Sequence, residues 1–185
     1  MAGLKLPLHE VCLDSNKLCG SCRLKIEKGQ VEHWEVRVLK ALLEAYRSTG
    51  SESSLAYEAS TIAGSTLYIA LEGPPLEGLE EALSRALRLR GVARVRIIYF
   101  TGGLKGLLEK ILDQKVIAVN KFYSVDGALT LKVTVENRNP GAEKLASSLL
   151  KIKVITEESK TERETRGKPL KVKVEDVKKT LDKLF

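Results

Sequence analysis

Apolar residues recur along this chain with the spacing of a helix in some stretches and the spacing of a strand in others. Over residues 31–47 they return every three or four positions, which places them on one helical face: Val31, Trp34, Val38, Leu42 and Tyr46. We expect the only tryptophan, Trp34, to anchor this helix to the core. The polar stretch that follows, STGSESS at 48–54, predicts a turn or linker.

Beyond the linker, short strands and helices alternate. The pattern predicts strands at 66–71, 92–100, 116–123, 128–135 and 152–156, and helices at 76–90, 104–112 and 142–151. In 128–135 the alternation is strict, with Leu131 and Val133 inward and Lys132 outward, and the Asp126–Gly127 pair before it is a hairpin signal. The predicted fold class is α+β, with helices packed on one face of small sheets.

A weak internal repeat divides the chain. Strand, proline-containing break, helix and strand follow one another from Thr66, and again about 62 positions later. Two small α+β units in tandem account for this order. We expect five parts: 1–30, 31–54 (helix and linker), 55–113 (first unit), 114–157 (second unit) and a charged tail at 158–185 with a terminal helix at 174–185.

Composition narrows the class of protein. The 185 residues include 31 basic and 24 acidic ones, and the resulting charge of +7 indicates an anionic partner, for which nucleic acid is the candidate. No apolar run approaches the ~20 residues of a membrane-spanning helix, so no membrane partner is expected. Without a secretion signal the expected location is cytoplasmic. Few Asn, Gln and Met beside many charged residues are typical of thermophile proteins.

All three cysteines fall within eleven residues, in the order His9-x2-Cys12-x6-Cys19-x2-Cys22. Two pairs, each separated by two residues, can place four ligands around one ion, and zinc favours thiolate and imidazole in a closed structural site. Gly20 suits a knuckle whose backbone amides face the sulfurs. Since the segment is short and poor in apolar residues, the metal would be what folds it. Residues 1–30 are therefore predicted to be a zinc-binding segment.

Alternatives to that ligand set remain open. His33, at the start of the long helix, is a second candidate for the fourth ligand. Cys19 and Cys22 alone could form a redox dithiol, although that motif normally opens a helix after a strand. A segment without metal is the third possibility.

A run of arginines is the strongest candidate for nucleic-acid binding. Five lie within twelve residues, and no acidic residue occurs between 82 and 98: Arg85, Arg88, Arg90, Arg94 and Arg96. Guanidinium groups suit bidentate contacts with phosphates. The alternative is a solubilising surface. A glycine-rich stretch, 102–106, either holds a phosphate at a helix start together with Lys105 or simply turns the chain.

Motifs of catalysis are missing from the sequence. It contains no Walker loop, nucleophile elbow or paired-carboxylate signature, and only two histidines. We therefore expect no enzymatic activity and no small-molecule substrate.

Two segments resemble a known family. The segment LPLHEVCLDSNKLCGSCRLKIEKGQV, followed by a helix, resembles the N-terminal zinc-binding segment of some archaeal NusA-like proteins. In those proteins a Cys-x2-Cys pair typically stands where His9 and Cys12 stand here. Residues 94–135 resemble the stretch that joins their two KH domains.

This resemblance implies a zinc knuckle or ribbon-like segment and a helix, followed by two tandem KH-like units. It implies a non-catalytic RNA-binding protein of the transcription elongation and termination machinery. Phosphate contacts would then come from Arg85, Arg88, Arg90, Arg94, Arg96, Lys105, Arg138 and Lys144. The alternative is a protein-interaction module of RNA polymerase or the ribosome that no longer binds RNA.

The sequence also departs from the family. The first unit has GPPLEGLEEALSRAL where a helix, a GxxG clamp and a second helix are expected. The tetrapeptide Gly103-Leu104-Lys105-Gly106 spells GxxG but follows a predicted strand. In the second unit the expected basic loop is reduced to residues 137–141. These departures favour the protein-interaction alternative.

Overall fold

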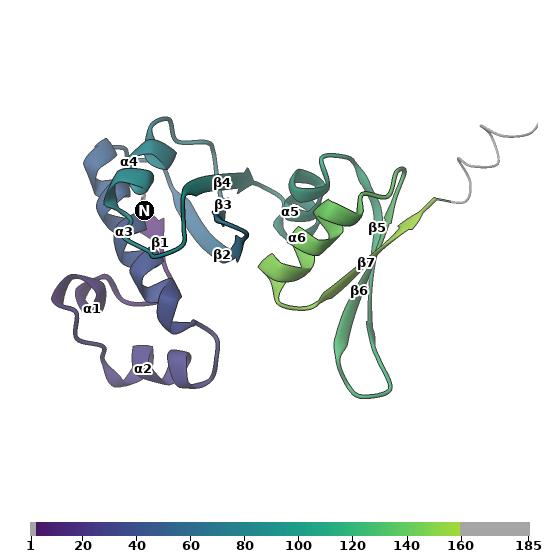
Figure 1. Ribbon diagram of the computed structural model, residues 1–185, viewed down its shortest axis with the longest axis horizontal. Coiled ribbons are helices and arrows are strands. Elements are labelled where there is room, and N and C mark those ends of the chain that lie inside the picture. Colours follow the sequence, from purple (N-terminus) through teal and green to yellow (C-terminus); the bar gives the residue numbers. More distant parts are fainter. Residues whose placement is uncertain (1–2, 160–185) are drawn as a thin grey trace, which may run out of the picture.

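The protein is an α+β structure with two small sheets, seen here in a computed structural model that describes residues 3–159 (Figure 1). Its N-terminal part holds β1 (Leu4–Lys5), α1 (Glu10–Ser15), α2 (Gly20–Glu27) and α3 (His33–Thr49). The next part holds β2 (Leu55–Ala63), β3 (Thr66–Glu72), α4 (Leu79–Ala86) and β4 (Arg94–Phe100). The last holds α5 (Gly103–Leu112), β5 (Val116–Tyr123), β6 (Leu129–Val135), α6 (Pro140–Leu150) and β7 (Lys153–Glu158). The predicted fold class is confirmed.

The topology of the two sheets is the same apart from the short strand β1. The first sheet has the order β1-β2-β3-β4 and the second β5-β6-β7. In each, an antiparallel hairpin is followed by a helix and a strand parallel to the second hairpin strand. Each hairpin also follows a helix, so the order helix–hairpin–helix–strand occurs twice. The internal repeat predicted from the sequence is confirmed.

Strand β2 escaped the sequence analysis. It pairs with β3 from Ala56 to Ala63, and the two strands are joined by a tight turn at Gly64, whose φ is +63°. Its exposed and buried positions do not alternate regularly, and the register shifts between Tyr57 and Ala59. A bulge interrupts the period of two on which strand recognition depends.

The first hydrophobic core joins the N-terminal segment to the first sheet. The predicted apolar face of α3 is buried in it, and α3 begins at a capping box between Glu32 and Glu35. Leu4, Leu8 and Leu13 belong to the same core. The N-terminal segment, predicted to be poor in apolar residues and folded by its metal, therefore also packs its leucines into a core shared with α3 and the first sheet.

The second core is formed by α5, α6 and the inner face of β5–β7. Leu107, Leu108 and Ile111 of α5 pack there with Leu131 and Val133. This core also contains Ala70 of β3 and Phe100 of β4, so α5, which the predicted division at residue 113 assigned to the first unit, packs against both units. Amphipathicity shows that a helix has a buried face without showing which sheet covers that face.

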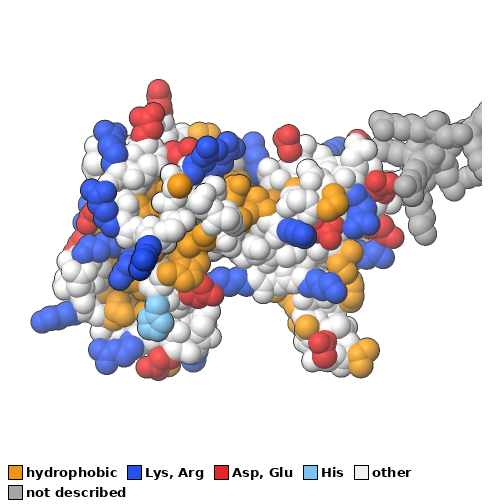
Figure 2. All heavy atoms as spheres, viewed as in Figure 1, with side chains coloured by type: hydrophobic (Ala, Val, Ile, Leu, Met, Phe, Trp, Pro, Cys, Tyr) orange, Lys and Arg blue, Asp and Glu red, His pale blue; other side chains and the backbone are white. Residues whose placement is uncertain are grey.

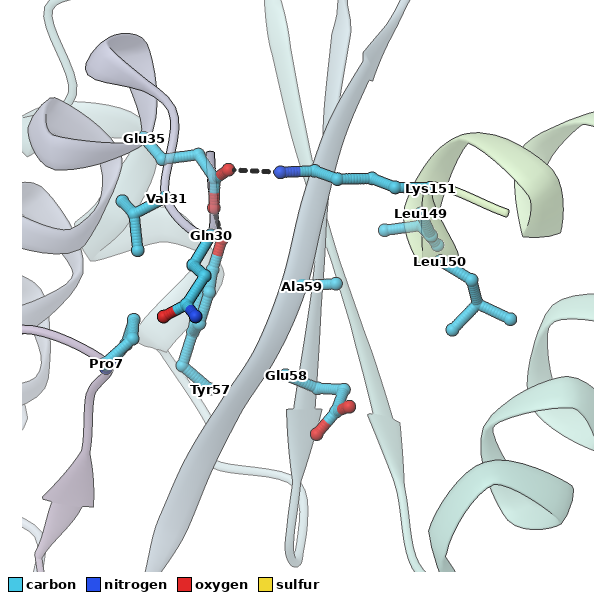
Figure 3. Close-up of a pocket in the computed structure, with 10 residues that line it drawn as sticks. All are labelled: Pro7, Gln30, Val31, Glu35, Tyr57, Glu58, Ala59, Leu149, Leu150 and Lys151. Carbon is cyan, nitrogen blue, oxygen red and sulfur yellow. Dashed lines mark hydrogen bonds and ion pairs between the residues drawn. The ribbon is translucent and has the colours of Figure 1, made fainter. Parts of the chain in front are cut away.

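The two units contact each other through apolar residues and through an ion pair between Glu35 and Lys151 (Figure 3). The Lys151 ammonium at the end of α6 lies 2.7 Å from a carboxylate oxygen of Glu35 on α3. Tyr57 donates a hydrogen bond of 2.7 Å to the other Glu35 oxygen. These groups border a cavity of about 190 Å³, which is also lined by Val31 and Leu149.

Some sequence predictions differ in extent or lie elsewhere. The helix predicted at 76–90 is shorter, Leu79–Ala86, because Leu87 is extended at φ −76° and ψ 124°. Within residues 3–159, no helix combines the length and apolar character that crossing a membrane requires. The terminal helix at 174–185 and the tail beyond residue 159 lie outside the described residues.

Candidate metal centre and basic surface

Four potential metal ligands converge between α1 and α2. One donor atom from each of His9, Cys12, Cys19 and Cys22 lies within 4.8 Å of the others. His9 precedes the first turn of α1, Cys12 lies inside α1, Cys19 is the N-cap of α2 and Cys22 lies in its first turn. Each pair of residues with x2 spacing thus lies at the start of a helix, one pair at α1 and the other at α2. One helical turn directs both side chains of a pair toward the same point. The predicted ligand set is brought together.

Backbone amides are directed at the three sulfurs. The amide of His9 donates to Cys22 Sγ at 3.3 Å, that of Cys19 to Cys12 Sγ at 3.4 Å, and that of Cys22 to Cys19 Sγ at 3.4 Å. Amide hydrogen bonds to sulfur stabilise it in its thiolate form. The expectation that amides face the sulfurs is confirmed. Gly20 donates none of these three bonds, and a Cβ on it would meet open space.

Two of the thiols, those of Cys19 and Cys22, have pKa values shifted in opposite directions. Hydrogen bonds from the backbone and the thiol of Cys22 lower the pKa of Cys19 to about 6. Burial raises the pKa of the Cys22 thiol. Cys19 is exposed, whereas Cys12 and Cys22 are buried. Cys19 therefore ionises before Cys22, and a cation at the centre would favour loss of the Cys22 proton.

The geometry favours the four-ligand interpretation over its alternatives. His33 lies on the surface at the first residue of α3 and is not part of the cluster. The Cys19–Cys22 pair does begin a helix, as a redox dithiol would. That helix follows α1 and not a strand, however, and the thiol of Cys12 lies in the same cluster. Four protein ligands that leave no open position form a structural site. This cluster could therefore hold a metal ion, which would cross-link α1 to α2.

Salt bridges fasten this segment to α3. Arg47 near the end of α3 contacts Asp14 at 2.7 Å and Glu10 at 3.3 Å, both on α1. The hydrogen bond from Arg47 holds the pKa of Asp14 below its ordinary value. These side chains are about half exposed, so the ion pairs contribute modestly. Together with the buried leucines they fix the candidate metal centre on the α3 surface.

The five predicted arginines surround the free edge of the first sheet. Arg85 lies in the last turn of α4, while Arg88 and Arg90 lie in the connection to β4. Arg94 and Arg96 lie on β4, the edge strand, where they pair in register with Thr66 and Tyr68.

These arginines do not form a single flat stripe. Val95, between Arg94 and Arg96, is buried in the first core beneath the helices. Arg94 and Arg96 therefore project from the opposite face of the sheet, because neighbouring strand residues alternate. Arg85 lies on the α4 side. The group wraps around the sheet edge, and Figure 2 shows basic side chains spread over this unit.

Every one of the five arginines is exposed. Within residues 3–159 none of them forms an ion pair with a carboxylate. Arg85 donates only to the carbonyl of Glu81, at 3.4 Å. Nearby, Glu80 accepts a hydrogen bond from the Ile97 amide of the edge strand at 3.2 Å. No carboxylate of residues 3–159 thus occupies these guanidinium groups.

The other predicted basic contacts are scattered. Lys105 is exposed on α5 and Lys144 is exposed on α6. Arg138 is occupied within the chain, because it lies 3.4 Å from Glu143 and donates to the Thr156 hydroxyl. Arg138 thus supports the start of α6.

Comparison with known proteins adds little. No protein-family model matches this chain, and no curated protein does. A solved structure described as "Crystal structure of APE1850" is similar at a TM-score of 0.44 and 14% identity. The match covers 64% of this chain and 96% of that one. This similarity is too low to carry a conclusion about fold or function.

Proposed function

We propose that this protein binds RNA without catalysing a reaction, as a NusA-like protein with two tandem KH-like units. The observation that carries the proposal is the group of five exposed arginines at the edge of the first sheet, none ion-paired within residues 3–159. The repeated helix–hairpin–helix–strand order supports the KH part of the proposal.

Electrostatics explains why these arginines point to an anionic partner. Like charges gathered at one sheet edge repel one another, and no carboxylate among the described residues lies within 4.0 Å of them to form an ion pair. A phosphate backbone supplies one negative charge per nucleotide and accepts two parallel hydrogen bonds from each guanidinium. Since the arginines lie on both faces of the sheet at β4, they can contact successive phosphates of an RNA strand that crosses the sheet edge.

The test is a salt titration of RNA affinity. Fluorescence anisotropy with a labelled single-stranded RNA should show binding that weakens as salt rises, because counterions are released. The double variant Arg94→Ala/Arg96→Ala should bind more weakly. Its slope of log affinity against log salt should be shallower by about 1.4, since each phosphate contact to a single strand contributes about 0.7.

A matched variant controls for net charge. Arg37→Ala/Lys110→Ala also removes two exposed positive charges, from α3 and α5. It should change the slope far less. Equal effects of the two double variants would mean that general charge, and not the sheet edge, attracts the RNA.

Zinc is our proposal for the ion at the Cys₃His cluster. Thiolate and imidazole donors select zinc over hard cations such as Mg²⁺ and Ca²⁺. The three amide-to-sulfur hydrogen bonds suit thiolate ligands. When bound, the ion supplies a cross-link and no reactive position. The chain's own part is to hold α1 and α2 against α3.

A specific observation also favours a second function, that of a protein-interaction module of RNA polymerase or the ribosome. The connection between α4 and β4, residues 87–93, contains no GxxG. Without that backbone clamp a KH-like unit lacks its usual grip on nucleotides. The absence of RNA binding at low salt, together with capture of one of these assemblies by the tagged protein, would favour this function.

A further inference from the structure

Exposed apolar side chains gather on the hairpin formed by β5 and β6. Seven large hydrophobic residues are exposed among residues 3–159, and four of them are Ile117, Phe122, Tyr123 and Val125. None of these four belongs to either core. The hairpin extends beyond α5 and α6, and apolar side chains are visible on it in the space-filling view (Figures 1 and 2).

The outer face of this sheet carries an aromatic ring beside lysines. Leu131 and Val133 lie on the inner face beneath α5 and α6, so Thr130 and Lys132 lie on the outer face. Phe122 pairs with Thr130, which pairs with Lys153, so these three form one row across the strands. The middle residue of the row, Thr130, is buried, whereas Phe122 and Lys153 are exposed.

The next row on the outer face consists of Asn120, Lys132 and Ile155. Adjacent strands lie about 4.8 Å apart, which places both lysines within side-chain reach of the phenyl ring. Lys132 forms a surface ion pair with Glu157 at 3.1 Å, about 40% exposed on both sides, and such a pair is weak enough to exchange for phosphate.

The end of the hairpin is held in a defined shape. The Ser124 amide donates to the Ala128 carbonyl at 2.9 Å, and the Gly127 amide to the Ser124 carbonyl at 2.8 Å. The Asp126 carboxylate accepts from the Ser124 hydroxyl and from the Ala128 amide. The exposed ring therefore stands on an ordered support, and a ligand that binds it need not first order the turn.

We infer that the outer face of this sheet stacks a base of single-stranded RNA on Phe122, with Lys132 and Lys153 contacting the flanking phosphates. The inference rests on the proposed RNA-binding function and adds a site on the second unit. An exposed aromatic face beside cations is how proteins bind unpaired bases without sequence preference. The ring supplies the stacking surface, and the positive charges select a nucleic acid over an apolar protein segment.

The experiment separates stacking from electrostatic binding. Phe122→Ala should lower the affinity for a labelled single-stranded RNA roughly 5- to 150-fold. Its salt slope should match that of the unchanged protein, because the ring releases no counterions. Phe122→Tyr, which keeps an aromatic ring, should bind the RNA with nearly the affinity of the unchanged protein. Val125→Ala is the matched control, since Val125 is apolar and fully exposed at the hairpin end but has no ring.

Several outcomes would overturn the inference. Unchanged affinity in Phe122→Ala, with the arginine double variant still weakened, removes the stacking site and leaves the proposed function standing. A complete lack of RNA binding by the unchanged protein removes both. If the protein forms a dimer by light scattering and Phe122→Ala is monomeric with full RNA affinity, the face is a contact between two copies.

Discussion

At the residue scale, the glycines before α5 serve the backbone. Gly102 and Gly103 have φ of +86° and +66°, a region that favours glycine. A Cβ on Gly106 would lie 1.6 Å from the carbonyl oxygen of Thr101. The sequence left open whether this stretch holds a phosphate or turns the chain. The turn requires Gly102 and Gly103, and the close approach to Thr101 requires Gly106. Backbone geometry alone therefore accounts for all three glycines.

Gly106→Ala should therefore destabilise the protein by about 2–4 kcal/mol, because the new methyl group and a backbone carbonyl cannot occupy the same space. Urea unfolding followed by circular dichroism measures the loss. Gly141→Ala is the control, since its Cβ would make only an ordinary contact of 3.5 Å with Asn139. A loss below 0.5 kcal/mol in Gly106→Ala would contradict the close approach seen here.

At the scale of elements, most strands and the long helices followed their patterns, whereas strand β2 and the short helices α1 and α2 did not. The strand predicted at 116–123 has those bounds, and the helix predicted at 142–151 is α6 at Pro140–Leu150. In contrast, α1 and α2 are six and eight residues long. Helix α1 buries only Cys12 and Leu13, and α2 buries only Cys22. These positions are too few to display an apolar stripe, so the sequence indicated only the candidate metal ligands of the two helices.

The metal segment gives the prediction at this scale. The purified protein should contain about one zinc per chain, as expected for a four-ligand site. Cys19→Ser should lower that content, whereas His33→Ala should not, because His33 lies outside the cluster. Zinc content after dialysis, measured by mass spectrometry, distinguishes them. Loss of zinc in His33→Ala but not in His9→Ala would reverse the assignment of the fourth ligand.

The pH dependence of zinc binding follows from the thiol pKa values. Cys19 has a pKa of about 6, and that of Cys22 is raised by burial. Protons compete for the thiolates, so affinity should fall as the pH is lowered. It should keep rising above neutral pH until the most basic thiol has ionised. A competition titration with a coloured chelator between pH 6 and 9 checks this sign.

At the scale of the whole molecule, the two units pack against each other and are not connected by a linker alone. Ala59 and Tyr68 belong to strands of the first sheet but pack against the second core. Glu35 contributes to the capping box of α3, accepts from Tyr57 and binds Lys151 on α6. Its side chain is only 4% exposed, so its partners matter more than those of a surface carboxylate.

The Glu35–Lys151 pair should couple the stability of the units. Lys151→Asn removes the charge and tolerates the left-handed backbone at φ +57°. Combined with Glu35→Gln in a double-mutant cycle, it should reveal a coupling of about 1 kcal/mol, a value limited by the 39% exposure of Lys151. Urea unfolding provides the energies. Strictly additive losses would show that the contact does not link the units.

The sequence by itself determined the features that depend on local spacing. The His9-x2-Cys12-x6-Cys19-x2-Cys22 order was sufficient to name the candidate ligands, because two residues between ligands span one turn, but it left His33 open as an alternative fourth ligand. The apolar periods were sufficient for α3, α5, α6 and most strands. The repeated order of elements followed from the same periods.

Only the tertiary structure decided how these parts combine. It assigned α5 to the second core, split the arginines between two faces of a sheet edge, and left Phe122 exposed on a strand that reads as apolar. Burial depends on which distant segment covers a face, and the sequence pattern shows only that a face exists. The pairing of Glu35 with Lys151, 116 residues apart, is likewise set by the packing of the two units.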